Sequence, residues 1–175
     1  MGTDGGDVVQ LEIPARPEYL ALVRLLVSAS ASGVPMFPDD RIDDLRLAVS
    51  EVCTNAIEAH VRATRDRRPS SPGDPAGADD RPEQLDHADQ IVIRCRLSDD
   101  AVEVEVRDHG LGFDPASLSD HPPVTDPRRL DYERGLGIPL VRILTDEVEF
   151  HPTADGTSVR MVLNAVPPTL ANDGD

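Results

Sequence analysis

The amino-acid sequence predicts an α+β fold in which helices cover one face of a largely antiparallel sheet. Two pairs of strand-like stretches, within residues 91–107 and 147–163, are each joined by a short polar turn, which is typical of β-hairpins. A long stretch of helical periodicity precedes the first pair. The elements follow the order β-α-α-β-β-α-β-β, and this order predicts a two-layer sandwich.

A length of 175 residues suits one domain with a sizeable core. We expect this domain to span residues 8–165, between flexible tails at 1–7 and 166–175. Within it, residues 65–90 are expected to form a disordered insertion. The stretch 67–82 holds four prolines, two glycines and almost no apolar residue, so it cannot bury enough surface to offset its ordering entropy.

The first half of the chain predicts one strand and two helices. The strand is expected at residues 8–13. Pro17 is suited to open a helix, which continues through an apolar stretch and ends at Gly33 and Pro35. A second helix is expected to start at residue 39 or 40 and to run to about residue 62.

The second helix has an apolar face and a separate polar face. Its apolar residues recur at spacings of three and four, which predicts a stripe facing the core. They are Ile42, Leu45, Val49, Val52 and Ala56. On another face Glu51 and Asn55 lie one turn apart, so their side chains can reach the same volume. A carboxylate beside an amide oxygen suits Mg²⁺, or the carboxylate could deprotonate a hydroxyl. An ordinary solvated helix face is the alternative.

Residues 108–113 read Asp-His-Gly-Leu-Gly-Phe and follow an alternating strand at residues 102–107. The strand would deliver the Asp108 carboxylate to a fixed point, while Gly110 and Gly112 leave the backbone open to close approach. We interpret the pattern as a contact for a small polar ligand. Turn chemistry after a strand is the alternative.

Gly135 and Gly137 stand directly before a third predicted helix at residues 138–144 and follow a polar, Pro-rich loop at 114–134. A helix that starts in bare backbone offers unpaired N–H groups and the positive end of its dipole to phosphate. The stretch is neither a P-loop nor a dinucleotide fingerprint, because Lys-Ser/Thr and a third glycine are missing. A plain junction between loop and helix is the alternative.

The hairpins complete the predicted sheet. The first pairs residues 91–97 with 102–107 around a Ser-Asp-Asp-Ala turn. The last pairs residues 147–150 with 157–163 around an Asp-Gly turn.

Charge and composition argue against several classes of partner. The chain carries 17 Lys+Arg against 33 Asp+Glu, a formal net charge of -16, which repels nucleic acids and anionic membranes. No stretch approaches membrane-spanning length, and the N-terminus lacks a signal-peptide pattern, so we expect a cytoplasmic location. Cys53 and Cys95 lack a metal-ligand spacing and are expected to be reduced core residues.

Four short motifs follow one another along the chain. They are Glu-x-x-x-Asn, Asp-x-Gly-x-Gly, Gly-x-Gly and Gly-Thr, starting at residues 51, 108, 135 and 156. Together they resemble the ATP-binding (Bergerat) fold shared by gyrase, heat-shock chaperones of the ninety-kilodalton class, histidine kinases and mismatch-repair ATPases, the GHKL superfamily. Residues 45–56 look most like the anti-sigma factor serine/threonine kinases. The resemblance covers roughly residues 8–165 and implies a two-layer α/β sandwich of the histidine kinase-like ATPase type.

The resemblance implies a role for each motif residue. Glu51 would be the general base toward a Ser or Thr hydroxyl of a protein, and Asn55 would hold Mg²⁺ at the phosphates of ATP. Asp108 would accept a hydrogen bond from the adenine amine, and Thr157 would support this pocket through water. Residues 114–134 would form a lid. The glycines that would open the backbone to base and phosphates are Gly110, Gly112, Gly135 and Gly137.

Three features depart from the family pattern and bear on catalysis more than on nucleotide binding. The family often has a His four residues after the Asn, where this chain has Ala59, with His60 one position further on. The lid has no Lys, and its cations are Arg128, Arg129 and Arg134. The insertion also lengthens the link after the second helix.

The family implies two protein partners. An alternative sigma factor would be sequestered, and a small anti-anti-sigma protein would be phosphorylated; a homodimer is also implied. A rival hypothesis is a non-catalytic nucleotide-binding module that sequesters a protein partner. A third, the ATP-binding half of a histidine kinase, is disfavoured because about forty residues before the second helix are too few for a dimerisation hairpin.

Overall fold

The computed structural model describes residues 6–66, 89–109, 137–153 and 156–166. Its elements run in the predicted order, with one added turn of 3-10 helix, η1, before the first helix. They are β1 (Asp7–Pro14), η1 (Pro17–Tyr19), α1 (Leu20–Ser32), α2 (Asp39–Asp66), β2 (Gln90–Leu97), β3 (Ala101–Asp108), α3 (Gly137–Leu144), β4 (Glu147–Thr153) and β5 (Gly156–Asn164).

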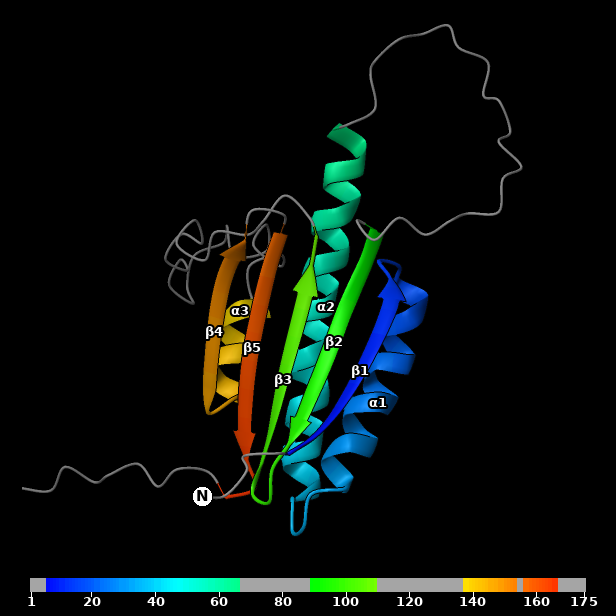
Figure 1. Cartoon of the computed structure of the whole chain (residues 1–175). Coiled ribbons are helices and arrows are strands. Elements are labelled where there is room, and N and C mark those ends of the chain that lie inside the picture. Colours follow the sequence, from blue (N-terminus) through cyan, green and yellow to red (C-terminus); the bar gives the residue numbers. More distant parts are fainter. Residues whose placement is uncertain (1–5, 67–88, 110–136, 154–155, 167–175) are drawn as a thin grey trace, which may run out of the picture.

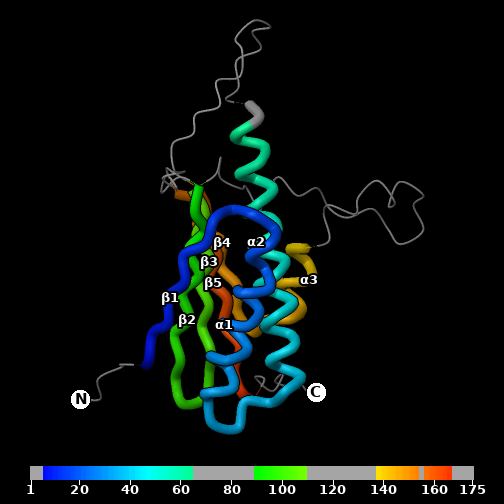
Figure 2. Tube along the Cα trace, turned by 90° about the vertical axis from the view of Figure 1, so that its right-hand side faces the viewer, coloured from blue at the N-terminus to red at the C-terminus, as the bar shows by residue number. Residues whose placement is uncertain are grey.

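The strands form one five-stranded sheet in the order β1-β2-β3-β5-β4, and every neighbouring pair is antiparallel (Figure 1). The helices α1, α2 and α3 lie on the same face of this sheet, as the side view shows (Figure 2). The predicted α+β class, with helices on one face, is confirmed.

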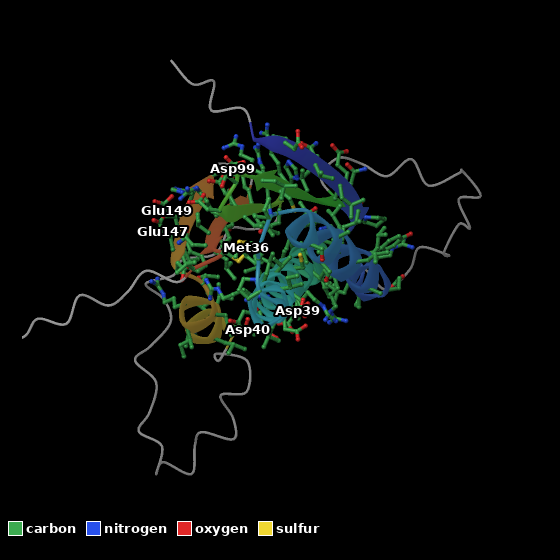
Figure 3. The ribbon with its side chains drawn as sticks, turned by 90° about the horizontal axis from the view of Figure 1, so that it is seen from below. Met36, Asp39, Asp40, Asp99, Glu147 and Glu149 are labelled. Atoms are coloured by element: carbon green, nitrogen blue, oxygen red, sulfur yellow. The ribbon has the colours of Figure 1, made fainter. Side chains whose placement is uncertain are left out.

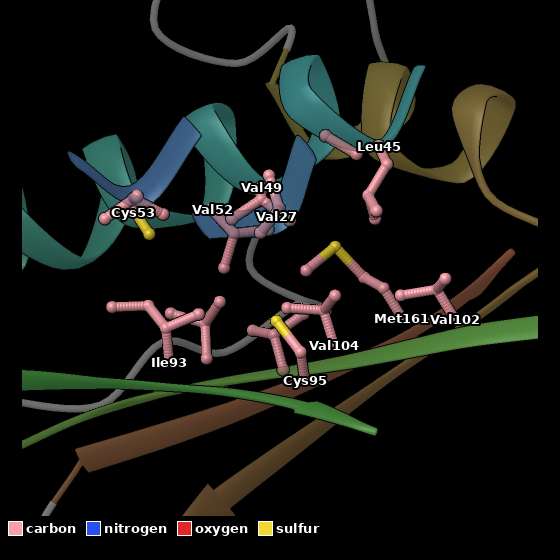
Figure 4. Packing of buried hydrophobic residues seen from close by; sticks show 14 of the residues in the cluster. Val27, Leu45, Val49, Val52, Cys53, Ile93, Cys95, Val102, Val104 and Met161 are labelled. Carbon is pink, nitrogen blue, oxygen red and sulfur yellow. The ribbon is translucent and has the colours of Figure 1, made fainter. Parts of the chain in front are cut away.

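The core lies between this sheet face and the helices. Alternate residues of β2, β3 and β5 point inward and are buried, as the period of two requires. They meet the apolar stripe of α2, where Leu45, Val49 and Val52 lie over Val104 and Met161 (Figure 4).

The opposite face of the sheet is polar. Arg160 bridges to Glu103 at 2.7 Å, Arg96 reaches the same carboxylate at 3.1 Å, and the Ser158 hydroxyl donates to Glu105 at 2.7 Å. Cross-strand pairs of this kind are usual on a sheet face that borders water. Helices on one face and charge pairs on the other fix which side of each strand faces the core.

The start of α2 is fastened to the sheet by one buried ion pair. Arg41 donates from Nη2 to Asp146 Oδ2 at 2.6 Å and from Nε to the Asn164 carbonyl at 3.3 Å. Asp146 Oδ2 also accepts the backbone N–H of Asn164 at 2.7 Å. Because α2 carries the polar face, this contact sets where that face lies relative to β4 and β5.

Several boundaries differ from those predicted. α2 continues to Asp66 and β2 begins at Gln90, so residues 67–88 of the predicted insertion lie outside the described residues. β4 continues through Pro152 to Thr153. It lies at the edge of the sheet, where a proline without a donor is tolerated. The domain limits of 8–165 stay a prediction.

Candidate functional site

Glu51 and Asn55 share a face of α2, as their spacing predicts, and both are half-buried. The first residue of α3, Gly137, lies directly against them. A Cβ placed on Gly137 would be 3.0 Å from Glu51 Oε2 and 3.4 Å from Asn55 Nδ2. The structure therefore brings three of the predicted site residues, far apart in sequence, into one place.

The turn of α2 that carries Glu51 is held from its side by α1. Arg24 Nε donates to the Ser50 hydroxyl at 2.8 Å, and Ser50 Oγ donates to the Arg46 carbonyl at 2.6 Å. Thr54 Oγ1 donates to the Ser50 carbonyl at 2.8 Å. The sequence reasoning missed these supports. Nothing in the local pattern points to Arg24, because its partner is 26 positions away.

Asp108 and Thr157 meet at a second place, the junction of β3 and β5. Asp108 ends β3 and stands opposite Thr157 in the antiparallel register. Thr157 is 2% exposed, and Asp108 is half-buried. Directly opposed residues of an antiparallel pair have Cβ atoms about 4.5–5.5 Å apart, so both side chains can reach the same volume.

Gly156 is the reason that β3 and β5 can approach so closely there. Its φ is +153°, and a Cβ at this position would overlap the Asp108 carbonyl oxygen and come within 2.8 Å of His109 Cα. Only glycine fits such a backbone without rearrangement. The Gly-Thr motif is visible in the sequence. The close approach of Gly156 to the Asp108 carbonyl follows only from the pairing of β3 with β5.

Other predicted site residues are outside the described part of the chain. These are Gly110, Gly112 and Gly135. The predicted lid, residues 114–134, is outside it too.

His60, the displaced histidine of the family pattern, contacts the chain next to β2. Its Nε2 lies 3.4 Å from Asp89 Oδ1, and its carbonyl accepts a hydrogen bond from Thr64 Oγ1 at 3.0 Å. One position of displacement turns a helical side chain by about 100°. The histidine is therefore not on the face that carries Glu51 and Asn55.

The donor set at the helix pair suits Mg²⁺ better than a softer metal. Asn55 and Glu51 offer hard oxygen atoms, and Mg²⁺ usually takes few protein ligands and completes its shell with phosphates and water. Within the described ranges no three His, Cys, Asp or Glu side chains gather in a way that could hold a metal. A site with one or two protein oxygens beside a phosphate group fits these residues.

Both cysteines are free and buried, as predicted. Burial raises the pKa of the Cys53 thiol to about 12 and that of the Cys95 thiol to about 11, with a Ser30 hydrogen bond opposing the latter shift. A thiol that stays protonated is neither a nucleophile nor a metal ligand at neutral pH. The chemistry of the site therefore rests on carboxylate, amide and backbone groups.

No helix in the described ranges is long and apolar enough to cross a membrane.

Comparison with known proteins shows the family of the chain. The profile of the histidine kinase-like ATPase domain matches residues 13–163. Serine-protein kinase RsbW of Bacillus pumilus is 33% identical over 158 residues, covering 89% of this chain and 84% of that protein. Serine-protein kinase RsbW of Bacillus subtilis is 32% identical over 148 residues, covering 83% and 78%.

A solved structure shows the same fold. The RsbU and RsbW domains of a Mycobacterium tuberculosis protein match with a TM-score of 0.53 and 16% identity. The match covers 90% of this chain and 32% of that longer chain. The profile spans most of the chain and the Bacillus kinases are more than 30% identical to it, so the chain belongs to the histidine kinase-like ATPase family, in the branch of the anti-sigma factor serine/threonine kinases.

Proposed function

We propose that this protein is an ATP-dependent serine/threonine protein kinase. The observation that carries the proposal is the contact of Glu51 and Asn55 with Gly137, the first residue of α3. A carboxylate, an amide oxygen and the N-terminus of a helix converge there. An anion such as a phosphate is stabilised at a helix N-terminus, and the carboxylate beside it can accept a proton.

The reaction follows from these positions. Glu51 accepts the proton of a Ser or Thr hydroxyl while that oxygen forms a bond to the γ-phosphorus of ATP. The bond between the γ-phosphorus and the bridging oxygen breaks, and ADP leaves with that oxygen. Asn55 would hold Mg²⁺, which supplies charge neutralisation at the phosphates.

The adenine end is proposed at Asp108 and Thr157. The Asp108 carboxylate would accept a hydrogen bond from the exocyclic amine, and the buried Thr157 hydroxyl would join through water. The register that places these residues opposite each other supports this assignment. Gly110, Gly112 and Gly135 are proposed to complete the pocket.

The proposal is tested by transfer of radiolabelled phosphate from ATP, with Mg²⁺, to candidate anti-anti-sigma proteins. Glu51→Ala should lower transfer by about 10²–10⁴-fold, the usual contribution of a general base, while ATP binding in calorimetry persists. Glu58→Ala is the matched control, because this exposed carboxylate lies on the same helix two turns further on. Transfer that survives Glu51→Ala would exclude Glu51 as the base.

The metal role of Asn55 is tested in the same calorimeter. Asn55→Ala should remove the dependence of ATP affinity on Mg²⁺. An unchanged difference between titrations with Mg²⁺ and with a chelator would reject that role.

We further propose that the protein sequesters an alternative sigma factor and phosphorylates an anti-anti-sigma protein. The similarity to RsbW serine-protein kinases supports this. The strongly negative charge favours association with basic surfaces. Complex formation that is insensitive to salt would count against the electrostatic part.

A non-catalytic module that binds ATP and sequesters a partner is the second candidate. It predicts nucleotide binding and partner binding without phosphate transfer. The presence of Glu51 beside Asn55 favours the kinase, since a binding module has no use for a base there.

A homodimer is also proposed. β1 forms one edge of the sheet within the described residues, and it carries no proline between Asp7 and Ile13. An open edge strand can pair with a second copy. Sedimentation equilibrium tests this, and a monomer at micromolar concentration would argue against it.

A further inference from the structure

Met36 has an environment that the fold does not explain. It lies in the connection between α1 and α2, its side chain is 95% exposed, and its φ is +60°. It is the only non-glycine residue with positive φ in the described part of the chain. A long apolar side chain adds nothing to the core from this position, and glycine would suit the backbone better.

Exposed carboxylates from separate elements surround Met36. Asp39 and Asp40 begin α2, Asp99 and Asp100 form the turn between β2 and β3, and Glu147 begins β4. The view from below shows Met36 amid Asp39, Asp40, Asp99 and Glu147 (Figure 3). We call these five acidic residues together with Met36 the acidic end.

Within the described residues, the nearby cations leave four of the five carboxylates of this end without a partner of opposite charge. Arg41 is committed to Asp146 at 2.6 Å, and its side chain is 10% exposed. Arg46 pairs with Asp43 at 2.7 Å. Glu147 lies 3.5 Å from Arg160. Among the described residues, no cation pairs with the other four carboxylates, Asp39, Asp40, Asp99 and Asp100.

A second exposed apolar residue belongs to the same end. The Ala165 N–H donates to the Asp100 carbonyl at 2.7 Å, which places Val166 beside the acidic turn. Val166 is 78% exposed. Two exposed apolar side chains therefore lie at the end of the molecule where four carboxylates have no cation partner among the described residues.

We propose that the acidic end is a docking surface for a basic segment of a partner protein. An apolar side chain of that segment packs on Met36, and its Arg or Lys side chains meet the unpaired carboxylates. Charge selects this occupant, because nucleic acid and anionic lipid are repelled, and a second acidic end would bring like charges together. The methionine side chain is flexible and can adapt its packing to a bound peptide.

The docking surface lies away from the proposed reaction. Asp108 is at the other end of β3 from Asp99 and Asp100. Glu51 stands 12 residues beyond Asp39 on α2, a rise of roughly 18 Å. Docking therefore goes beyond the proposed kinase function, and it should persist without ATP and in Glu51→Ala, which separates its failure from failure of the kinase proposal.

The first experiment finds the occupant. A photoreactive amino acid is placed at position 36 of the full chain in cells that produce the protein, and the cross-linked peptide is sequenced. The control carries it at Leu25, an apolar residue of α1 that is 66% exposed. We expect one peptide, with more Arg and Lys than Asp and Glu, from position 36 only. The same yield from Leu25, an acidic peptide, the chain itself, RNA or no product would overturn the proposal.

The second experiment titrates that peptide, labelled with a fluorophore, against purified variants without nucleotide. Met36→Gly should weaken binding by about tenfold or more, because it removes a buried methionine contact, without lowering the melting temperature. Asp99→Asn with Asp100→Asn should weaken binding and reduce its salt dependence. Glu12→Gln with Glu58→Gln makes the same charge change on exposed residues elsewhere and should have no such effect. Equal affinities for Met36→Gly and the unaltered protein, or equal losses in both double variants, would refute the surface.

Discussion

The two ends of the proposed nucleotide site are built in different ways. At the end proposed for the adenine base, called the base end below, strand register fixes Asp108 and Thr157. Gly156 lets the backbones of β3 and β5 approach each other there. At the reactive end, Glu51 and Asn55 meet Gly137 through side-chain atoms across two packed helices. One end is thus set by hydrogen-bonded backbone and the other by the ends of side chains.

This difference predicts different tolerance to change. Backbone in a sheet ladder cannot shift locally without losing hydrogen bonds. A carboxylate or amide at the end of a rotatable chain can move by tenths of an ångström at little cost. Substitutions at the base end should therefore lower the free energy of unfolding strongly. Substitutions at the reactive end should change the free energy of unfolding little but lower phosphate transfer.

Gly156→Ala should have the largest effect. The added Cβ overlaps the Asp108 carbonyl, and the φ of +153° is strained for any L residue. Backbone strain and overpacking each cost about 1–3 kcal/mol, so we expect a loss of about 3 kcal/mol or more in the free energy of unfolding. Urea denaturation measures it.

A matched control for Gly156→Ala is Gly33→Ala. The nearest atom to a Cβ at Gly33 is the Ser30 carbonyl oxygen at 3.2 Å, and its φ is −78°. A small change at Gly33 and a large one at Gly156 would support a backbone constraint peculiar to the base end. Equal changes would contradict it.

Asp108→Asn should have the next largest effect. It replaces the charged acceptor of the adenine amine by a neutral amide, so ATP affinity should fall by about 1–3 kcal/mol, the range for losing a hydrogen bond to a charged group. Calorimetry with ATP measures it, with Asp89→Asn as a control on a half-exposed carboxylate just before β2. Unchanged affinity in Asp108→Asn would rule out that role and leave the base end with a structural purpose only.

Alkaline pH distinguishes the helix layer from the sheet layer. The folded pKa of Cys53 on α2 is raised to about 12 and that of Cys95 on β2 to about 11, from 9.0, because burial disfavours the thiolate. The contribution of each thiol to the free energy of unfolding is fully present below pH 9. Above pH 9 the free energy of unfolding should fall by about 1.4 kcal/mol per pH unit per thiol, because only the unfolded chain loses the proton.

The composition makes this measurement clean. The chain has no lysine and two tyrosines, so few other groups titrate between pH 9 and 11. Urea titrations of Cys53→Ala and Cys95→Ala across this range should each show a shallower decline than the unaltered protein. A slope that Cys53→Ala does not change would mean that the Cys53 thiol on α2 is not kept protonated by burial in the folded protein.

The sequence was sufficient for the parts of the fold that depend on periodicity. Alternation in β2 and β3 predicted which residues are buried, and the spacing of Glu51 and Asn55 predicted a shared helix face. Local pattern decides both features, because the strand and helix periods set which side chains point the same way.

Contacts between distant elements could not be read in that way. The support of Ser50 by Arg24, the fastening of Arg41 to Asp146 and the crowding of Gly156 by Asp108 each join residues on different elements. Their existence depends on how those elements pack. The exposure of Met36 depends in the same way on how the connection between α1 and α2 is placed, and no local pattern indicates it.

Gly137→Ala should have the smallest effect on stability and tests the comparison most directly. The nearest neighbours of the new Cβ are Glu51 Oε2 at 3.0 Å and Asn55 Nδ2 at 3.4 Å, both at the ends of flexible side chains. We expect a change of less than about 1 kcal/mol in the free energy of unfolding, because alanine also favours the helix. Phosphate transfer should nevertheless fall, since Glu51 must move aside from the phosphate position. Measured together, urea denaturation and transfer to the acceptor protein separate the two effects. A destabilisation as large as that of Gly156→Ala would show that the reactive end is as rigid as the base end. Unaltered phosphate transfer would show that Glu51 does not act as the general base beside Gly137.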